Sequence, residues 1–194
     1  MGSADEVINI CVNEAFRYRG GLGEQMHRID EARGAYRDAS GDIVTKVMGW
    51  NRGEKARLKN ETEYFFVCVR GIVRMAEAVE RMAQKEGLTE LESRVAKALG
   101  AFDGEAPHAV FLRDFLAHLD EYARGDGRYE LPQPDHPMVV APTEDDVLLY
   151  LSGIPLSVNR TFQAAMALSD VLRDISNDRH DSGRGSETKP SGET

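Results

Sequence analysis

The apolar positions between residues 60 and 85 recur at alternating intervals of three and four, the most regular pattern in the chain. They are Phe65, Cys68, Ile72, Met75, Val79 and Met82. This spacing places them on one side of an α-helix that runs from Asn60 to Lys85. Asn60 followed by Glu63 is typical of a helix N-terminus, and Gly87 is suited to end the helix. An apolar side of this length predicts partner helices, either within the chain or in a dimer.

Shorter patterns of the same kind predict further helices on both sides of this segment. They are expected at Asp5 to about Tyr18, Glu24 to about Ala39, Thr89 to about Phe102, about Pro107 to Arg124, and about Pro155 to Ser176. The glycine-rich residues 19–23 are expected to separate the first two, because glycine is unfavourable inside a helix. The inward positions of the last helix are predicted to be Val158, Phe162, Ala165, Leu168, Leu172 and Ile175.

Prolines and short β-branched or aromatic runs mark the segment before the last helix. Either Met138–Ala141 or Tyr129–Leu131 is predicted to pair with Val147–Leu151 as a small β-hairpin. The expected fold class is therefore mainly α, a helical bundle of five to six helices with a small β-hairpin before the last helix.

The last residues of the chain differ from everything before them. Residues 178–194 contain no aliphatic or aromatic residue. Such a segment buries too little apolar surface to offset the entropy lost on ordering, so it is predicted to be a disordered tail. Residues 1–177 are expected to form a single helical domain.

Charge and composition limit the classes of function. The 194 residues carry a formal net charge of −9, which argues against a broad basic surface for nucleic acid but not against a local phosphate-binding cleft. The apolar runs are too short for a membrane span and the N-terminus lacks a secretory pattern, so a cytoplasmic protein is expected. Cys11 and Cys68 are expected to be reduced core residues, and no cysteine and histidine spacing indicates a metal site.

Five basic residues lie between residues 46 and 59. Lys46 precedes Trp50, and four others follow it: Arg52, Lys55, Arg57 and Lys59. One interpretation is that Gly41 to Lys59 form a solvated loop containing a short strand or helical piece. The alternative is an RNA-facing patch, in which Trp50 stacks on a base while Arg52, Lys55 and Arg57 bind the substrate's phosphates.

Three residues of the helix expected at 107–124 form the candidate catalytic group, namely Arg113, Asp114 and His118. Asp114 and His118 are four residues apart, so on a helix the carboxylate can contact the imidazole. Histidine can take a proton from a ribose 2′-hydroxyl or return one to the leaving oxygen. Arginine can bind phosphate and stabilise the charge of the transition state. These residue types suit RNA cleavage that needs no metal and no cofactor.

The sequence Arg113-Asp114-x3-His118 resembles the R-x4-6-H motif of the HEPN superfamily. The resemblance covers residues from about 61 to 175 and implies a helical bundle that forms a homodimer, with one cleft built from two motif helices. It also implies a metal-independent endoribonuclease that leaves a 2′,3′-cyclic phosphate, with Arg113 and His118 catalytic and Asp114 in support. Proteins of this superfamily are found in bacterial toxin–antitoxin and phage-defence systems, which implies RNA as substrate and an antitoxin or another defence protein as partner.

Other interpretations stay open beside the active ribonuclease. One is a catalytically silent HEPN-like module that binds nucleotide or RNA, and another is a helical interaction protein. A second match, Arg173-Asp174 with His180, also fits the motif. It is not preferred, because His180 falls in the expected tail beyond the end of the last helix.

Overall fold

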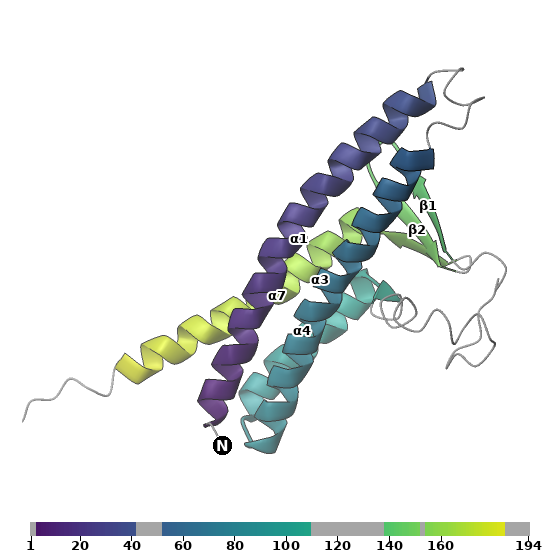
Figure 1. The fold of residues 1–194 in the computed structure, drawn as a ribbon. Coiled ribbons are helices and arrows are strands. Elements are labelled where there is room, and N and C mark those ends of the chain that lie inside the picture. Colours follow the sequence, from purple (N-terminus) through teal and green to yellow (C-terminus); the bar gives the residue numbers. More distant parts are fainter. Residues whose placement is uncertain (1–2, 42–51, 110–137, 152–153, 185–194) are drawn as a thin grey trace, which may run out of the picture.

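The computed structural model describes residues 3–41, 52–109, 138–151 and 154–184. In chain order, its elements are α1 (Ala4–Gly41), α3 (Arg52–Lys85), α4 (Thr89–Glu105), β1 (Met138–Pro142), β2 (Val147–Leu151), β3 (Ile154–Ser157) and α7 (Val158–Arg184). The mainly α fold class is confirmed, as is the small antiparallel sheet before the last helix (Figure 1). These described residues contain four helices, fewer than the five to six expected for the whole chain.

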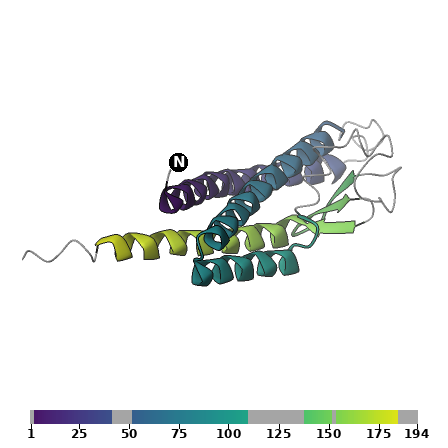
Figure 2. The same cartoon turned by 90° about the horizontal axis from the view of Figure 1, so that it is seen from below.

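The two longest helices, α1 and α3, form an antiparallel pair (Figure 1). Contacts across the pair show the direction, since Tyr18 of α1 meets Gly71 of α3, whereas the later Gln25 meets the earlier Glu61. α4 packs on α3, and α7 contacts α1, α3 and α4 (Figure 2). One hydrophobic core joins the four helices and continues to the sheet.

α1 is one uninterrupted helix of 38 residues, so the break expected at residues 19–23 is wrong. The apolar positions keep one phase across the glycines, because Ala15, Leu22 and Ile29 are seven residues apart and all buried. Burial of this continuous side outweighs the poor helix propensity of glycine, which costs ~1 kcal/mol per residue.

Glycines also let α1 and α3 approach closely. A Cβ atom added to Gly21 would lie 3.3 Å from the Sγ of Cys68 across the interface. On the other helix, a Cβ atom added to Gly71 would lie 2.4 Å from the ring of Tyr18, too close for carbon atoms of two different residues in van der Waals contact. The glycines that suggested a turn are therefore partly explained by this packing.

α3 begins at Arg52, so Asn60 lies inside the helix and the start predicted at Asn60 is wrong. Its fully buried side also alternates between intervals of three and four. This side comprises Leu58, Thr62, Phe65, Val69, Ile72, Ala76, Val79 and Ala83. Half of the predicted seam belongs to it, whereas Cys68, Met75 and Met82 lie at its edge and are partly buried. The partner helices come from the same chain, so this side is not open to a second copy.

The connection between α3 and α4 agrees with the sequence. α3 ends at Lys85, α4 begins at Thr89, and Gly87 between them has a φ of 69°. This left-handed conformation favours glycine, which has no Cβ atom to clash.

α7 differs from the expected last helix at both ends. It begins at Val158 rather than at Pro155, because residues 154–157 form β3, a strand that the sequence did not predict. It continues to Arg184, so the disorder predicted for residues 178–184 is wrong. The predicted inward side is confirmed, with Phe162 partly buried and the other five positions buried. The remainder of the predicted tail, residues 185–194, lies outside the described residues.

The sheet has the order β1-β2-β3, and both pairs of neighbours are antiparallel. β1 and β2 pair along their full lengths, which confirms the first of the two predicted hairpins. The alternative strand at Tyr129–Leu131 lies outside the described residues. Val140, Leu149 and Leu156 face one another across the three strands and are buried, so one face of the sheet closes the core.

The helix expected from about Pro107 has its first helical residue at Ala109. Pro107 and His108 form a turn before it, and His108 has a φ of 69°. The rest of that expected helix, residues 110–124, lies outside the described residues.

Candidate functional site

The residues predicted to perform catalysis, Arg113, Asp114 and His118, lie outside the described residues, as does Trp50. The structure does place the two ends of the segment that carries them. That segment follows Ala109, which is fully buried, and it precedes Met138, the first residue of β1. Ala109 and Met138 therefore mark the described frame on either side of this segment.

The predicted phosphate-binding residues lie in the first two turns of α3, which starts at Arg52. Lys55 is exposed. Arg57 is half-exposed, and its Nη2 lies 3.3 Å from Oε2 of Glu31 on α1. The same carboxylate lies 3.3 Å from Nε2 of His27 through its other oxygen. An acidic residue that is distant in sequence thus offsets part of the basic charge expected from residues 46–59 alone.

One carboxylate organises the junction between the hairpin turn and α7. Oδ1 of Asp146 accepts hydrogen bonds from the backbone N–H groups of Val147, at 2.7 Å, and Asn159, at 3.0 Å. Its Oδ2 accepts one from the hydroxyl of Ser157 at 2.5 Å, and Ser157 Oγ in turn accepts the N–H of Arg160 at 2.9 Å. Ser157 is therefore the N-cap of α7, and Asp146 holds the cap in place. The negative charge also suits the positive end of the helix dipole.

Two further contacts fasten this end of the bundle. Nη1 of Arg33 on α1 donates to the backbone oxygen of Glu144 in the hairpin turn at 2.8 Å. Nη2 of Arg160, in the first turn of α7, lies 3.0 Å from Oε2 of Glu105 at the end of α4. Together with Asp146, these contacts tie the end of α4, the hairpin turn and the start of α7 to one another and to α1.

Because α7 extends to Arg184, the second motif match, Arg173 with His180, lies within one helix. His180 was set aside because it was expected beyond the helix end, but both Arg173 and His180 belong to α7. Seven residues correspond to nearly two full helical turns, so the two positions share one face. The sequence gave no apolar signal for this extension, because residues 178–184 are polar.

Arg173 shares an acidic partner, Asp170, with Arg19 of α1. Oδ1 of Asp170 lies 3.0 Å from Nη2 of Arg173 and 2.5 Å from Nη1 of Arg19. Arg19 also donates to Oγ of Ser169, which is buried, at 2.7 Å. Arg173 lies 3.7 Å from Asp174 as well, and its side chain keeps 46% of its surface exposed. It is thus an accessible guanidinium with two acidic neighbours.

The thiols have no sign of catalytic activation. Burial raises the pKa of the Cys11 thiol, although the charge of Arg81 opposes this in part, and burial also raises the pKa of Cys68. Both groups therefore stay protonated at neutral pH, which fits their expected role as packing residues. Within the described ranges, no group of three His, Cys, Asp or Glu side chains could hold a metal ion, and no helix there is long and apolar enough to cross a membrane.

No family model, curated protein or solved structure matches the chain.

Proposed function

We propose that the protein is a metal-independent endoribonuclease of HEPN type that acts as a homodimer in a bacterial toxin–antitoxin or phage-defence system. The observation that carries the proposal is the sequence Arg113-Asp114-x3-His118. Arg113 binds the scissile phosphate, His118 transfers protons to and from the ribose and leaving oxygens, and Asp114 orients His118. The product carries a 2′,3′-cyclic phosphate.

Two features of the described residues support this proposal. The chain is mainly helical, which is the fold class that the motif implies. The described residues on either side of the motif-bearing segment are fixed, since Ala109 is fully buried and Met138 is paired in β1. A fixed support matters because catalytic groups must be positioned to within fractions of an ångström.

The test is cleavage of a single-stranded RNA by the purified protein in EDTA. Arg113→Ala and His118→Ala should each abolish cleavage while the circular dichroism spectrum remains that of the wild type. Asp114→Asn should lower the rate less, because an amide oxygen can still accept a hydrogen bond from the imidazole. The rate should change between pH ~5 and ~8, the range in which histidine ordinarily titrates.

Matched controls come from the described helices. Arg17→Ala and His27→Ala change an arginine and a histidine that belong to neither motif and whose side chains are 79% and 74% exposed on α1. Both variants should cleave RNA like the wild type. If they lost activity as well, cleavage would not report on the motif.

The second match in α7 makes the assignment of residues testable. Arg173→Ala and His180→Ala should leave cleavage intact if the site is at Arg113 and His118. Loss of activity in these two variants alone would move the active site to α7. If each of the four alanine variants still cleaved RNA, the proposal would be contradicted.

RNA binding without cleavage would instead identify the silent binding module. A homodimer at tens of micromolar, seen by light scattering, is expected because the motif helices of two protomers build one cleft. A strictly monomeric but active protein would contradict that part of the mechanism.

A further inference from the structure

The three-stranded sheet has an apolar outer face. Side chains along a strand point alternately to opposite faces, and Val140, Leu149 and Leu156 lie on the buried inner face. The outer face therefore carries two rows across the strands, with Val139, Tyr150 and Pro155 in one and Ala141, Leu148 and Ser157 in the other. Apart from Ser157 and the hydroxyl of Tyr150, these side chains are hydrocarbon. Because a sheet face in contact with water is ordinarily polar, this composition predicts that the outer face is covered.

The hydrophobic core of the described residues reaches only the inner face of the sheet. α3 and α7 contact the strands, and they share one core with that inner face. Among the described residues, none of the apolar side chains of the outer face is part of this core or packs against it. Val139 is 42% exposed, and Pro155 is exposed as well. The described residues thus leave the outer face outside the core that they form.

The outer face has the size of one helix. Three strands about 4.8 Å apart and up to five residues long, at about 3.3 Å per residue, make a face about 14 Å wide and about 17 Å long. A helix with its side chains is about 10 Å wide, so one helix covers most of this face. A second copy of the chain would need about 800 Å² on each partner, several-fold more than the roughly 240 Å² of this face. A segment of the same chain needs less area, because docking within one molecule costs no translational freedom.

Residues 110–137 connect α4 to β1, and the described residues on either side of them lie close to the sheet. Met138 begins β1 and directly precedes Val139 of the outer face. At the other end, Glu105 lies four residues before Ala109, and its Oε2 is 3.0 Å from Nη2 of Arg160, just beyond β3. The segment between these two points is therefore within reach of the outer face.

The same segment has an apolar side of matching length. Leu112, Phe115, Leu119 and Tyr122 recur at intervals of three and four, the spacing of one side of a helix. They extend over ten residues, which is about 15 Å along a helix axis and close to the length of the strands. The 13 residues 125–137 can span about 45 Å when extended, enough to lead from such a helix to Met138.

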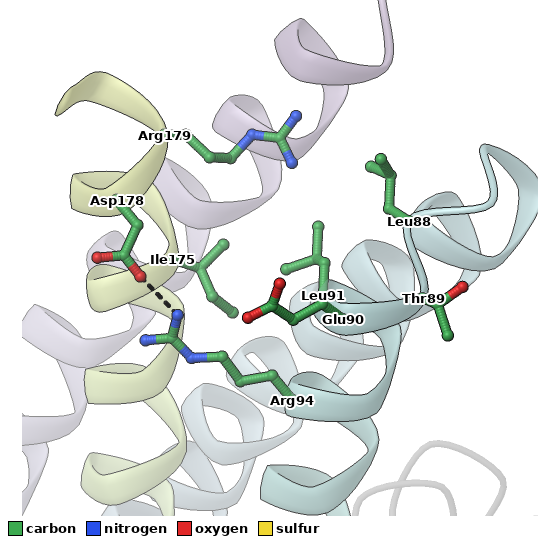
Figure 3. A pocket seen from close by; sticks show the side chains of 8 residues that line it. All are labelled: Leu88, Thr89, Glu90, Leu91, Arg94, Ile175, Asp178 and Arg179. Atoms are coloured by element: carbon green, nitrogen blue, oxygen red, sulfur yellow. Dashed lines mark hydrogen bonds and ion pairs between the residues drawn. The ribbon is translucent and has the colours of Figure 1, made fainter. Parts of the chain in front are cut away.

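The cavity at the other end of α7 suits this segment less well. It has a volume of about 370 Å³ and lies between the first turns of α4 and the last turns of α7 (Figure 3). Ile175 in its wall is about 25 Å along α7 from Val158, the residue that follows β3. Its wall also contains charged side chains, among them Arg94 and Asp178, whose Nη1 and Oδ2 atoms lie 2.6 Å apart. The outer face of the sheet is apolar and adjoins the end of the segment, so it is the better match.

We propose that the outer face of the sheet is the docking surface of residues 110–124, which pack on it as one helix. The apolar side of this segment lies on Val139, Leu148 and Tyr150. Arg113 and Asp114 follow Leu112 by about 100° and about 200° around a helix, so they lie off the docked side. The docking depends on the apolar side alone and is therefore independent of the ribonuclease proposal.

Digestion of the full chain with chymotrypsin, followed by mass spectrometry, tests this contact. Chymotrypsin accepts aromatic side chains, and docking buries two of them, Phe115 and Tyr122. Val139→Glu places a charge in the contact and should speed cleavage after both residues about tenfold, because proteolysis follows the population of the undocked form. Val67→Glu is the matched control, since this valine on α3 is 50% exposed, and it should leave the rate unchanged. Unchanged cleavage of Val139→Glu, or equal acceleration by Val67→Glu, would overturn the proposal.

Leu119→Glu changes the other side of the same contact and leaves the strands intact. It should speed cleavage after Phe115 as much as Val139→Glu does, and the double variant should be cleaved no faster than either single variant. Accelerations that multiply would show two independent effects and contradict the docking.

Light scattering separates this segment from a second copy as the cover of the sheet. Docking within the chain predicts the same mass for the wild type and Val139→Glu. A mass that falls in Val139→Glu would show that the outer face is a subunit interface, and the proposal would fail. Neither measurement uses RNA, so the outcome is separate from that of the cleavage assay.

Discussion

The interface of α1 with α3 and the junction of the hairpin turn with α7 are held together by opposite means. Between α1 and α3, buried residues recur over most of both helices, and Gly71 brings the backbone of α3 against the ring of Tyr18. At the junction, one side chain, Asp146, accepts three hydrogen bonds from two backbone N–H groups and a hydroxyl. The first depends on shape over a long surface, and the second depends mainly on one carboxylate.

This contrast explains what each region tolerates. An interface of many small contributions loses little when one exposed position changes, but it has no room for an added atom. A junction built on one acceptor has room around it, yet it leaves several donors unsatisfied when that acceptor is removed. Variants that remove a group should therefore harm the junction most, and variants that add a group should harm the helix pair.

The largest effect is expected for Asp146→Ala. It removes charge-assisted hydrogen bonds and the support of the α7 N-cap, so the free energy of unfolding should fall by about 3 kcal/mol. Urea unfolding followed by circular dichroism measures this change. Asp145→Ala is the matched control, because Asp145 is exposed and contacts α7 through its backbone oxygen, which accepts a hydrogen bond from the side chain of Asn159. Equal effects of the two substitutions would contradict the role of the Asp146 carboxylate.

Gly71→Ala should have the next largest effect. The added Cβ atom would lie within 2.4–2.6 Å of three ring atoms of Tyr18, so the helices must separate or the ring must move. Overpacking of this kind costs about 2 kcal/mol. In thermal unfolding, Gly20→Ala should instead stabilise α1, because nothing lies within 4 Å of the added atom.

A double substitution identifies the cause of the Gly71→Ala effect. In a Tyr18→Ala background the added Cβ atom no longer meets the ring, so Gly71→Ala should cost much less there. A penalty of the same size in both backgrounds would show that the two helices do not approach at this point.

Gly87→Ala should destabilise the protein by about 1 kcal/mol for a different reason. No atom lies within 4 Å of the added Cβ, but the φ of 69° is unfavourable for alanine. Gly100→Ala in α4 is the matched control and should stabilise, since its added atom also meets nothing and Gly100 lies in a regular helix. Chemical denaturation of the pair separates backbone conformation from packing, and destabilisation by both would contradict this explanation.

The same contrast decides how much of the fold could be predicted. Apolar spacing located the inward side of α7, because burial of side chains leaves a periodic signal, while Gly87 marked the end of α3 and short β-branched runs marked the hairpin. Prediction failed at residues 19–23, where glycine propensity suggested a turn although the apolar phase from Ala15 to Leu22 continued. It also failed at residues 154–157 and 178–184, which are ordered by strand pairing and by polar contacts such as that of Asp178 with Arg94.

The candidate site shows the same limit. A motif such as Arg113 with His118 can be found in sequence because its chemistry requires particular residues at short range. The pairing of Arg57 with Glu31 joins residues from different helices, so the local count of basic residues could not reveal it. The role of Asp146 could not be predicted from its neighbours in sequence either, because its partners Ser157 and Asn159 lie beyond β2.

The most direct test of the ribonuclease proposal is the 3′ end of RNA incubated with the protein in EDTA. The wild-type protein should produce fragments that end in a 2′,3′-cyclic phosphate, and folded His118→Ala should produce none. If the wild type leaves the RNA intact, or if His118→Ala releases the same fragments at the same rate, the central claim is contradicted.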